Sequence, residues 1–201
     1  MIVELIGGIE EAKRFVEMAL DEGKDVVTAN KYLMSLYGDD LFERAAKTGA
    51  RLLFEASVAG GLPIIQTLRE GLAPDRILSI NAILNGTCNY ILTRMEQNPG
   101  MDCEAAVAEA KARGFAEADP SLDISGMDTA QKISILIRKA FRTRILPEDI
   151  DIQGITGVSN VDVQSAKEMG YRIKLLARAN REGDNLGIVV LTEPVDGHRR
   201  V

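Results

Sequence analysis

The residues best suited to chemistry gather in the middle of the chain. Residues 114–123 carry three carboxylates, and Asp128 and Lys132 follow four residues apart on an expected helix. Because positions i and i+4 share a helix face, the carboxylate can hold the ammonium group and tune its pKa, which suits proton transfer. The alternative is a surface salt bridge, worth at most about 0.5 kcal/mol.

Charged and amide side chains also follow or interrupt the expected strands. Lys31 comes directly after a strand at residues 25–29, where it can face a substrate oxygen or a cofactor amide or, alternatively, stay solvated in a loop. Glu55 lies within the expected strand at residues 51–56, where a buried carboxylate needs a donor or a cation unless that face is wet. Asn85 follows another strand, and its Asn-Gly-Thr sequence either brings backbone amides to a ligand or caps the next helix.

Other common active-site chemistries lack their residues. The single histidine, His198, lies near the end of the sequence, so a Ser/His/Asp triad is not possible. Cys88 and Cys103 have no histidine nearby and no metal or redox spacing. We expect both cysteines to be inert packing residues in a reducing cytoplasm.

The elements that must position these residues begin with a βαβαβ pattern. Its parts are strands at residues 2–6, 25–29 and 51–56, a helix that ends at Gly23, and a helix at residues 39–49. Such a unit predicts parallel strands with right-handed crossovers, as in half of a doubly wound dinucleotide-binding sheet. No Gly-x-Gly-x-x-Gly follows any of the strands, so another parallel α/β domain remains the alternative.

The second region reads as α+β. We expect helices at residues 62–71, 87–97, 102–113 and 128–142, a strand at 77–84, and a hairpin of strands 171–178 and 186–191 whose loop is somewhat longer than two residues. The strands predict one mostly open sheet with helices on one face, which leaves the other face for a partner. The predicted domains are therefore residues 1–56, a remnant of a dinucleotide-binding domain, and residues 57–201, a catalytic and dimerisation domain.

Composition excludes several function classes. The 201 residues carry 24 Lys and Arg against 30 Asp and Glu, for a net charge of −6, with 46% hydrophobic and 27% charged residues. No apolar run approaches the roughly 18 residues that span a bilayer, and the N-terminus lacks the basic flank of a signal peptide. With 4% aromatic residues and interleaved charges, the chain offers no nucleic-acid surface. We expect a cytoplasmic protein without a nucleic-acid or membrane partner.

Five motifs in fixed order carry a resemblance. They are Val-Glu-Leu-Ile-Gly-Gly at 3–8, Val-Val-Thr-Ala-Asn-Lys at 26–31, Phe-Glu-Ala-Ser-Val-Ala-Gly-Gly-Leu-Pro-Ile-Ile at 54–65, Ile-Leu-Asn-Gly-Thr-Cys-Asn-Tyr-Ile-Leu at 83–92, and Gly-Phe-Ala-Glu-Ala-Asp-Pro-Ser-Leu-Asp-Ile-Ser-Gly-Met-Asp-Thr-Ala-Gln-Lys at 114–132. The last is the most specific. A chain with these motifs resembles homoserine dehydrogenase, over about residues 2–178.

The resemblance implies NAD(P)-dependent interconversion of L-aspartate 4-semialdehyde and L-homoserine, on the pathway to threonine, methionine and isoleucine, by a homodimer. It assigns the proton donor to Lys132, the acid beside the substrate to Asp128, and the substrate amino group to Glu117. In the reducing direction, Lys132 would protonate the alkoxide that forms as hydride reaches the aldehyde carbon. The resemblance places Lys31 at the junction of substrate and nicotinamide and Gly114 against the cofactor.

Two further assignments come with the resemblance. Asn85 falls near the nicotinamide end of the cofactor, beside Lys31 and Gly114. Glu55 and the carbonyl groups of three later residues match a monovalent cation site, usually sodium; those residues are Val58, Gly60 and Leu62.

The chain also departs from the family pattern. The N-terminal glycine fingerprint, a later glycine-rich segment and a C-terminal regulatory domain are not in this sequence, so we expect an internal portion of such an enzyme that binds dinucleotides weakly. The choice between NAD and NADP stays open. The alternative function is a non-catalytic substrate-binding or assembly module of the same fold.

Overall fold

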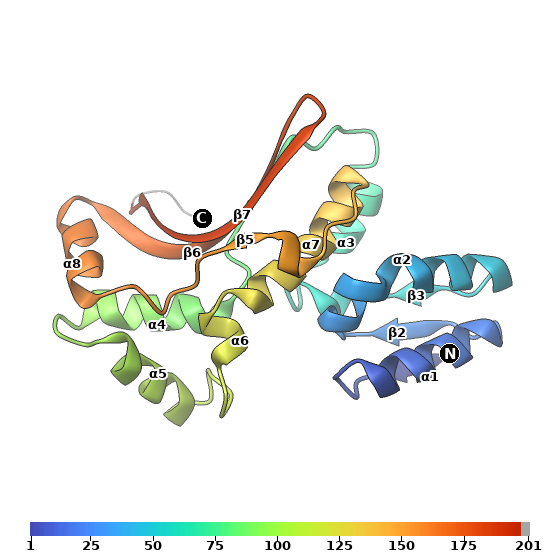
Figure 1. Cartoon of the computed structure of the whole chain (residues 1–201), viewed down its shortest axis with the longest axis horizontal. Helices are drawn as coiled ribbons and strands as arrows, with labels where there is room; N and C mark the ends of the chain where they lie inside the picture. Colours follow the sequence, from blue (N-terminus) through green and yellow to red (C-terminus); the bar gives the residue numbers. More distant parts are fainter. Residues whose placement is uncertain (198–201) are drawn as a thin grey trace. The chain divides into compact units, whose positions relative to one another are not determined.

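A computed structural model of the chain describes residues 1–197 (Figure 1). The chain divides into two units. The first comprises Met1–Ile77 and Gln131–Pro147, and the second comprises Leu78–Ala130 and the described residues from Glu148 onward. His198 lies outside the described residues. The division predicted between residues 56 and 57 stays a prediction.

The first unit is built on a parallel sheet in the order β1-β2-β3, with β1 at Ile2–Glu4, β2 at Val26–Thr28 and β3 at Leu52–Leu53. Helix α1 (Glu10–Asp21) joins β1 to β2, and helix α2 (Lys31–Thr48) joins β2 to β3. The predicted parallel βαβαβ unit is confirmed. Its fully buried side chains come from both helices and the central strand, and include Val16, Leu20, Val26, Leu33 and Leu41.

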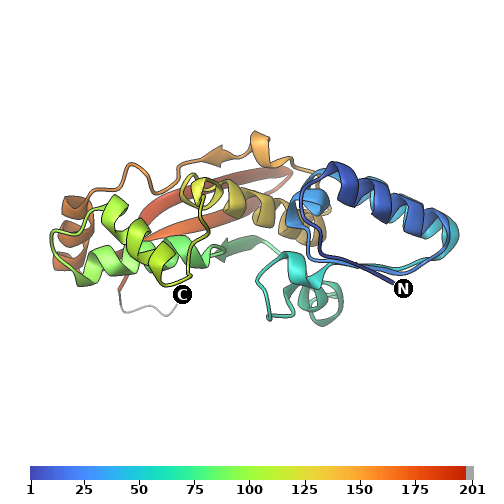
Figure 2. The same cartoon turned by 90° about the horizontal axis from the view of Figure 1, so that it is seen from below.

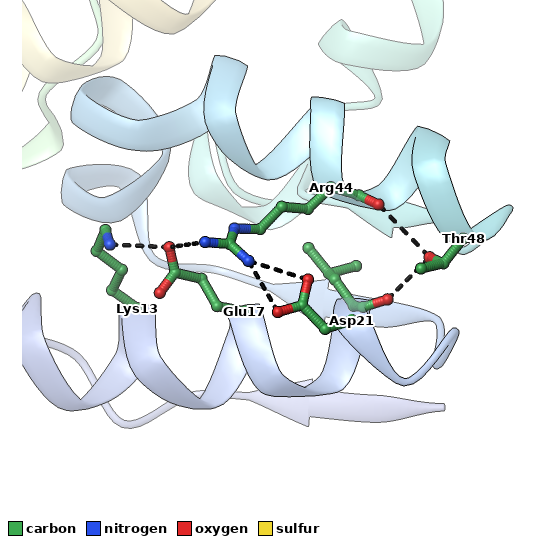
Figure 3. Close-up of polar contacts among 6 residues, drawn as sticks. Lys13, Glu17, Asp21, Arg44 and Thr48 are labelled. Atoms are coloured by element: carbon green, nitrogen blue, oxygen red, sulfur yellow. Dashed lines mark hydrogen bonds and ion pairs between the residues drawn. The ribbon is translucent and has the colours of Figure 1, made fainter.

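A row of polar contacts fastens α1 to α2 (Figure 3). Glu17 accepts from Lys13 at 2.8 Å and lies 3.4 Å from Arg44, whose guanidinium also donates to Asp21 at 2.8 and 3.0 Å. At the far end, the Thr48 hydroxyl donates to the carbonyl oxygen of Leu20 at 2.8 Å. These partly exposed pairs are worth at most about 1 kcal/mol each, so they fix the helix register more than they stabilise the fold.

Helix α2 starts eight residues earlier than the predicted start at residue 39. The Asn30 side chain caps it by accepting from the Leu33 N–H at 3.0 Å, so Lys31 is the first helical residue rather than part of a loop. Gly38 lies in the middle of α2, where a Cβ would be only 2.8 Å from Nη1 of Arg138. This close approach explains why the position is a glycine. The Arg138 guanidinium, on helix α7 (Met127–Phe141), donates to the carbonyls of Met34 and Ser35 at 2.7 and 3.0 Å.

The chain after β3 differs from the predicted strand at residues 51–56. Only Leu52–Leu53 pairs with β2, and Glu55–Ser57 forms a 3₁₀ turn, η1. The predicted helix at 62–71 is present as α3 (Ile64–Gln66) followed by a π-helical turn, η2 (Thr67–Gly71).

The second unit is built on a mixed sheet in the order β4-β6-β7-β5. Strand β4 (Ser79–Ala82) pairs antiparallel with β6 (Tyr171–Glu182), β6 pairs antiparallel with β7 (Asn185–Asp196), and the short β5 (Asp151–Ile152) pairs parallel with β7. The predicted longer hairpin loop is wrong. Glu182 pairs with Asn185, which leaves a two-residue turn whose Gly183 has φ +63°.

Helices cover this sheet. Helix α4 (Gly86–Gln97) and helix α8 (Asn160–Glu168) both contact β6, as Figure 1 and Figure 2 show, and α5 (Cys103–Ala112) contacts α4. From β6, Lys174 reaches Asn89 at 2.6 Å and Thr93 at 3.2 Å on α4, and burial there lowers the pKa of Lys174.

The short elements of this unit were not predicted from the sequence: β5, α8, the 3₁₀ turn η3 (Pro147–Asp149) and α6 (Ser121–Ile124), which lies in the predicted loop at 114–123. Within residues 1–197, no helix has the length and apolar character needed to cross a membrane.

Candidate functional site

Two carboxylates and one amide form a polar cluster in the second unit. The Nδ2 atom of Asn85 donates to Oδ1 of Asp123 at 2.6 Å and to Oδ2 of Asp128 at 2.7 Å. Asn85 is 3% exposed and Asp128 4% exposed, so the hydrogen bond between them is shielded from water, whereas Asp123 is half-buried. The cluster joins the starts of α4 and α7 to the end of α6.

Local structure explains how Asn85 reaches this place. It is the N-cap of α4, and its Oδ1 accepts from the Cys88 N–H at 2.7 Å, so one of the two predicted alternatives, helix capping, is present. The buried Cys88 thiol in turn donates to the carbonyl oxygen of Asp123 at 3.1 Å. A residue predicted to be inert thus also holds the backbone of the cluster.

Two glycines allow the α6–α7 turn to lie close to the chain around β5. Gly126 has φ +89°, and a Cβ there would lie 2.8 Å from a methyl carbon of Ile152. A Cβ on Gly154 would lie 2.2 Å from the Ile124 carbonyl oxygen, which itself accepts from the Ile155 N–H at 2.8 Å. Close backbone packing therefore fixes where α7 begins.

Helix α7 carries the predicted acid and lysine. Asp128 lies in its first turn, where the helix dipole favours a negative charge, and Lys132 follows one turn later with a half-buried side chain. The predicted helix and the predicted spacing are both present.

The loop that carries Glu117 is tied to α4 at its start. Gly114 has φ +75°, which lets the chain turn back after α5. Phe115 then stacks on Tyr90 with ring centroids 4.6 Å apart, and the Thr87 hydroxyl donates to the Phe115 carbonyl at 3.0 Å. Glu117 itself is exposed.

The Tyr90 hydroxyl donates to Glu109 at 2.9 Å, and Arg94 and Arg113 each lie 3.0 Å from the same carboxylate. The hydrogen bonds from Tyr90 and Arg94 lower the pKa of Glu109, whereas burial and this carboxylate raise the pKa of Tyr90. The stacked Tyr90 is therefore itself held in place.

In the first unit, a buried carboxylate closes the carboxyl end of the sheet. Glu4, 3% exposed, accepts from the Thr28 hydroxyl at 2.6 Å and from the Ile6 N–H at 2.8 Å. Thr28 accepts from the Asn30 N–H at 2.9 Å, and the Asn30 amide donates to the Gly8 carbonyl at 2.8 Å. This network holds the turn from which Lys31 begins α2.

Glu55 is half-buried and meets two backbone donors. Its two carboxylate oxygens accept from the N–H groups of Ile65 and Gln66 at 2.8 and 3.0 Å, at the start of α3. The chain between Glu55 and Ile65 turns tightly, since the Leu62 N–H donates to the Gly60 carbonyl at 2.5 Å. Among residues 1–197 no three His, Cys, Asp or Glu side chains group as metal ligands, so a cation here would depend on Glu55 and carbonyl oxygens.

The predicted site residues fall in both units. Asn85, Gly114, Glu117 and Asp128 belong to the second, whereas Lys31, Lys132, Glu55 and the residues Val58, Gly60 and Leu62 belong to the first. Their roles stay predictions.

Sequence analysis missed Glu4, although a carboxylate within Ile-Val-Glu-Leu-Ile carries the same signal of a buried charge that drew attention to Glu55. It named Asp123 only as a loop carboxylate. Nothing local in the sequence shows that Asn85 meets Asp123, since 38 residues separate them.

The two strand–helix junctions of the first unit differ in how they suit a dinucleotide. After β1, the N–H groups of Ile6 and Gly7 donate to Glu4, and α1 begins with two glutamates, which repel a phosphate. After β2, helix α2 begins Lys31-Tyr-Leu-Met, so no carboxylate in its described first turn opposes an electron-rich ligand group. The β1 junction does not fit a pyrophosphate, whereas the β2 junction has, in the described first turn of α2, no carboxylate that would repel an electron-rich ligand group.

Fold and site together define a class: α/β proteins that join a nucleotide-binding type of parallel sheet to an open mixed sheet with a carboxylate–lysine helix. Comparisons with known proteins agree. A family profile described as "Homoserine dehydrogenase, NAD binding domain" matches residues 1–55, and one described as "Homoserine dehydrogenase" matches residues 63–198. The chain belongs to the homoserine dehydrogenase family.

Individual relatives support the assignment. The homoserine dehydrogenase of Bacillus subtilis is 44% identical over 192 residues, which are 94% of this chain and 44% of that protein. A crystal structure of a homoserine dehydrogenase from Thiobacillus denitrificans superposes with a TM-score of 0.94 at 44% identity, over 98% of this chain and 46% of the other. The structure of a hyperthermophilic archaeal homoserine dehydrogenase in complex with NADPH superposes with a TM-score of 0.83 at 31% identity, over 98% of this chain and 57% of the other. The chain thus spans less than half the length of the curated relative.

Proposed function

We propose that the chain contributes the substrate-converting part of an NAD(P)-dependent homoserine dehydrogenase, which interconverts L-aspartate 4-semialdehyde and L-homoserine. The observation that carries the proposal is the buried Asn85–Asp123–Asp128 cluster at the start of α7, one turn before Lys132. The family match over both parts of the chain gives this cluster its substrate.

In the reducing direction, the proposed roles follow from charge. The carboxylates of Glu117 and Asp128 attract the substrate's ammonium group and hold the aldehyde near α7. Lys132, as an ammonium ion, donates one proton to the alkoxide oxygen and recovers it from solvent, so the aldehyde becomes a primary alcohol. Asp128 orients Lys132 from the preceding turn.

The cofactor NADPH or NADH supplies the hydride when it is bound. Lys31, at the positive end of α2, is proposed to face the reacting end of substrate and nicotinamide, with Gly114 and Asn85 on the cofactor side. A monovalent cation such as sodium is proposed at Glu55 with the carbonyls of Val58, Gly60 and Leu62.

We also propose a cytoplasmic homodimer. Two free thiols, Cys88 and Cys103, suit a reducing compartment. The β6–β7 hairpin is twelve residues long on each side and can offer one face to a second copy. Sedimentation of the chain at micromolar concentration tests the dimer, and a monomeric mass would contradict it.

The test of function is an assay of a complete version of the enzyme with aspartate semialdehyde and NADPH or NADH, because the 201-residue chain is expected to bind dinucleotides weakly. Calorimetric titration of the 201-residue chain with L-homoserine accompanies it. In a complete version of the enzyme, we expect Lys132→Met to lower kcat by roughly 10²-fold or more while cofactor affinity is largely spared. Unchanged kcat in Lys132→Met would contradict its role. Homoserine binding without any turnover would instead favour the non-catalytic module.

A further inference from the structure

We infer that Asn85 is a positioning residue whose side-chain amide holds the carboxylates of Asp123 and Asp128 together as one substrate-facing pair. The inference rests on the proposed function for the identity of the substrate, but not for the geometry of the pair. It gives Asn85 a task other than the cofactor contact expected from the family resemblance.

The first step is that both donor protons and the oxygen of this amide meet protein groups. The two Nδ2 protons go to Asp123 at 2.6 Å and Asp128 at 2.7 Å, and Oδ1 accepts from the Cys88 N–H at 2.7 Å. The Cys88 bond also fixes which end of the amide is oxygen, because an N–H must meet an acceptor. Asn85 is therefore locked and 3% exposed, which suits a structural bridge.

The second step concerns charge. Two carboxylate oxygens bonded to one nitrogen lie at most about 5 Å apart, and like charges so close repel each other. A neutral amide that donates one N–H to each is the smallest group that offsets this repulsion without adding a cation. A cationic group such as the substrate's ammonium would complement the negative charge of this pair.

The third step is that the bridge spans elements far apart in sequence. Asn85 is the N-cap of α4, Asp123 lies in the last turn of α6 and Asp128 lies in the first turn of α7. The amide therefore sets the distances between the ends of three helices. Cys88 reinforces the same contact through the Asp123 carbonyl at 3.1 Å. Loss of the amide should let the α6–α7 turn move relative to α4.

The geometry is tested first, by nuclear magnetic resonance of the full chain labelled with ¹⁵N. We expect both Asn85 side-chain amide protons to resonate downfield and to exchange slowly with solvent. Asp123→Asn should shift one of the two protons and Asp128→Asn the other. If neither variant moves an Asn85 proton, the proposed bridge is wrong, whatever the function of the chain.

The role is tested by L-homoserine titration of Asn85→Ser. Serine is also an N-cap residue, so this variant keeps the cap on α4 but loses both donors to the carboxylates. We expect homoserine affinity to fall at least about tenfold, and the melting temperature to fall as well, because the buried Asp128 carboxylate loses a donor. Asn85→Asp, which caps equally well but adds a third carboxylate, should weaken homoserine binding further.

Asn98→Ala is the matched control, because Asn98 caps the other end of α4 and donates to the Arg94 carbonyl at 2.8 Å. It should bind homoserine like the unchanged chain. Wild-type affinity in Asn85→Ser would overturn the positioning role, as would an equal loss in Asn98→Ala. If the unchanged chain shows the amide pattern but does not bind homoserine, the bridge stands and the proposed function fails.

Discussion

Each unit of the molecule places an asparagine at the start of the helix that follows a strand, next to a buried carboxylate. In the first unit, Asn30 caps α2 and sends its amide to the Gly8 carbonyl, while Glu4 is satisfied by Thr28 and backbone N–H groups. In the second unit, Asn85 caps α4 and sends its amide to the two carboxylates. The same type of helix cap therefore has a different role in each unit.

The difference lies in what the amide donors meet. Around Asn30, the side-chain amide donates to the Gly8 carbonyl between β1 and α1, and the backbone N–H donates to Thr28 at the end of β2. This network therefore shapes the turn before Lys31. Around Asn85, a single side chain holds two charges from distant helices. Buried charges are costly unless they are bonded, so a cluster that keeps two of them is more informative about function than one that bonds the backbone.

The largest effect on stability should come from Gly154→Ala, which disturbs the backbone packing beneath the Asn85 cluster and leaves the Asn30 network untouched. The new Cβ would lie 2.2 Å from the Ile124 carbonyl oxygen, a backbone atom that cannot move aside. We expect a loss of at least about 3 kcal/mol in the free energy of unfolding, and loss of the Asn85 amide signals but not those of Asn30.

Gly157→Ala is the control for that variant, because a Cβ there meets no atom within 4 Å. Chemical denaturation of both variants measures the difference. Equal stabilities would show that the close approach of residue 154 to α6 does not support the cluster.

Thr28→Val should have the next largest effect and should disturb the first unit alone. It removes the donor to the buried Glu4 carboxylate and the acceptor for the Asn30 N–H, and so leaves two polar groups unpaired. We expect a cost of about 2 kcal/mol, while Thr28→Ser, which keeps the hydroxyl, should restore most of it. A Thr28→Val chain as stable as the unchanged one would mean that Glu4 finds another donor.

The same comparison shows how far sequence reasoning reaches. The parallel βαβαβ unit and the α7 spacing followed from hydrophobic periodicity, which depends on neighbours along the chain. The start of α2 at Lys31 was missed. Gly38 lies inside this helix, and only Arg138, a hundred residues later in the chain, explains why a glycine stands there. The partners of Asn85 were beyond reach for the same reason. Short elements such as β5 are set by pairing with β7 and carry no periodicity of their own.

A smaller effect is expected from pH at the contact that anchors the Glu117 loop. Hydrogen bonds from Tyr90 and Arg94 lower the pKa of Glu109, so folding favours its ionised form. Its contribution to stability is present above the pKa of an unfolded glutamate, about 4.3, and is lost as pH falls through the lower folded value.

Urea unfolding between pH 7 and pH 3 measures this contribution. Glu109→Gln should flatten the acid side of the stability profile relative to the unchanged chain, whereas Glu104→Gln, at an exposed site on the same helix α5, should not. If the stability profiles of all three chains are parallel, Glu109 does not contribute to the loss of stability in acid.

The smallest expected effect concerns the sheet edge of the first unit. Strand β1 pairs with β2 on one side only. Val3 in the strand is 56% exposed, and Leu5 and Ile6 directly after it are 73% and 63% exposed. Beside the strand lies a hollow of about 310 Å³ lined by Ile2, Phe15 and Met18 among others. An exposed apolar edge with unpaired backbone groups promotes association, so the 201-residue chain should self-associate there at tens of micromolar.

Because a charge at such an edge opposes strand pairing, Val3→Lys should weaken this association a few-fold, measured by sedimentation. Val161→Lys makes the same change at a 72% exposed valine of the second unit and should leave it unchanged. If Val3→Lys removes all association, the dimer proposed through the β6–β7 hairpin is wrong; if it removes none, the edge of β1 is not the contact.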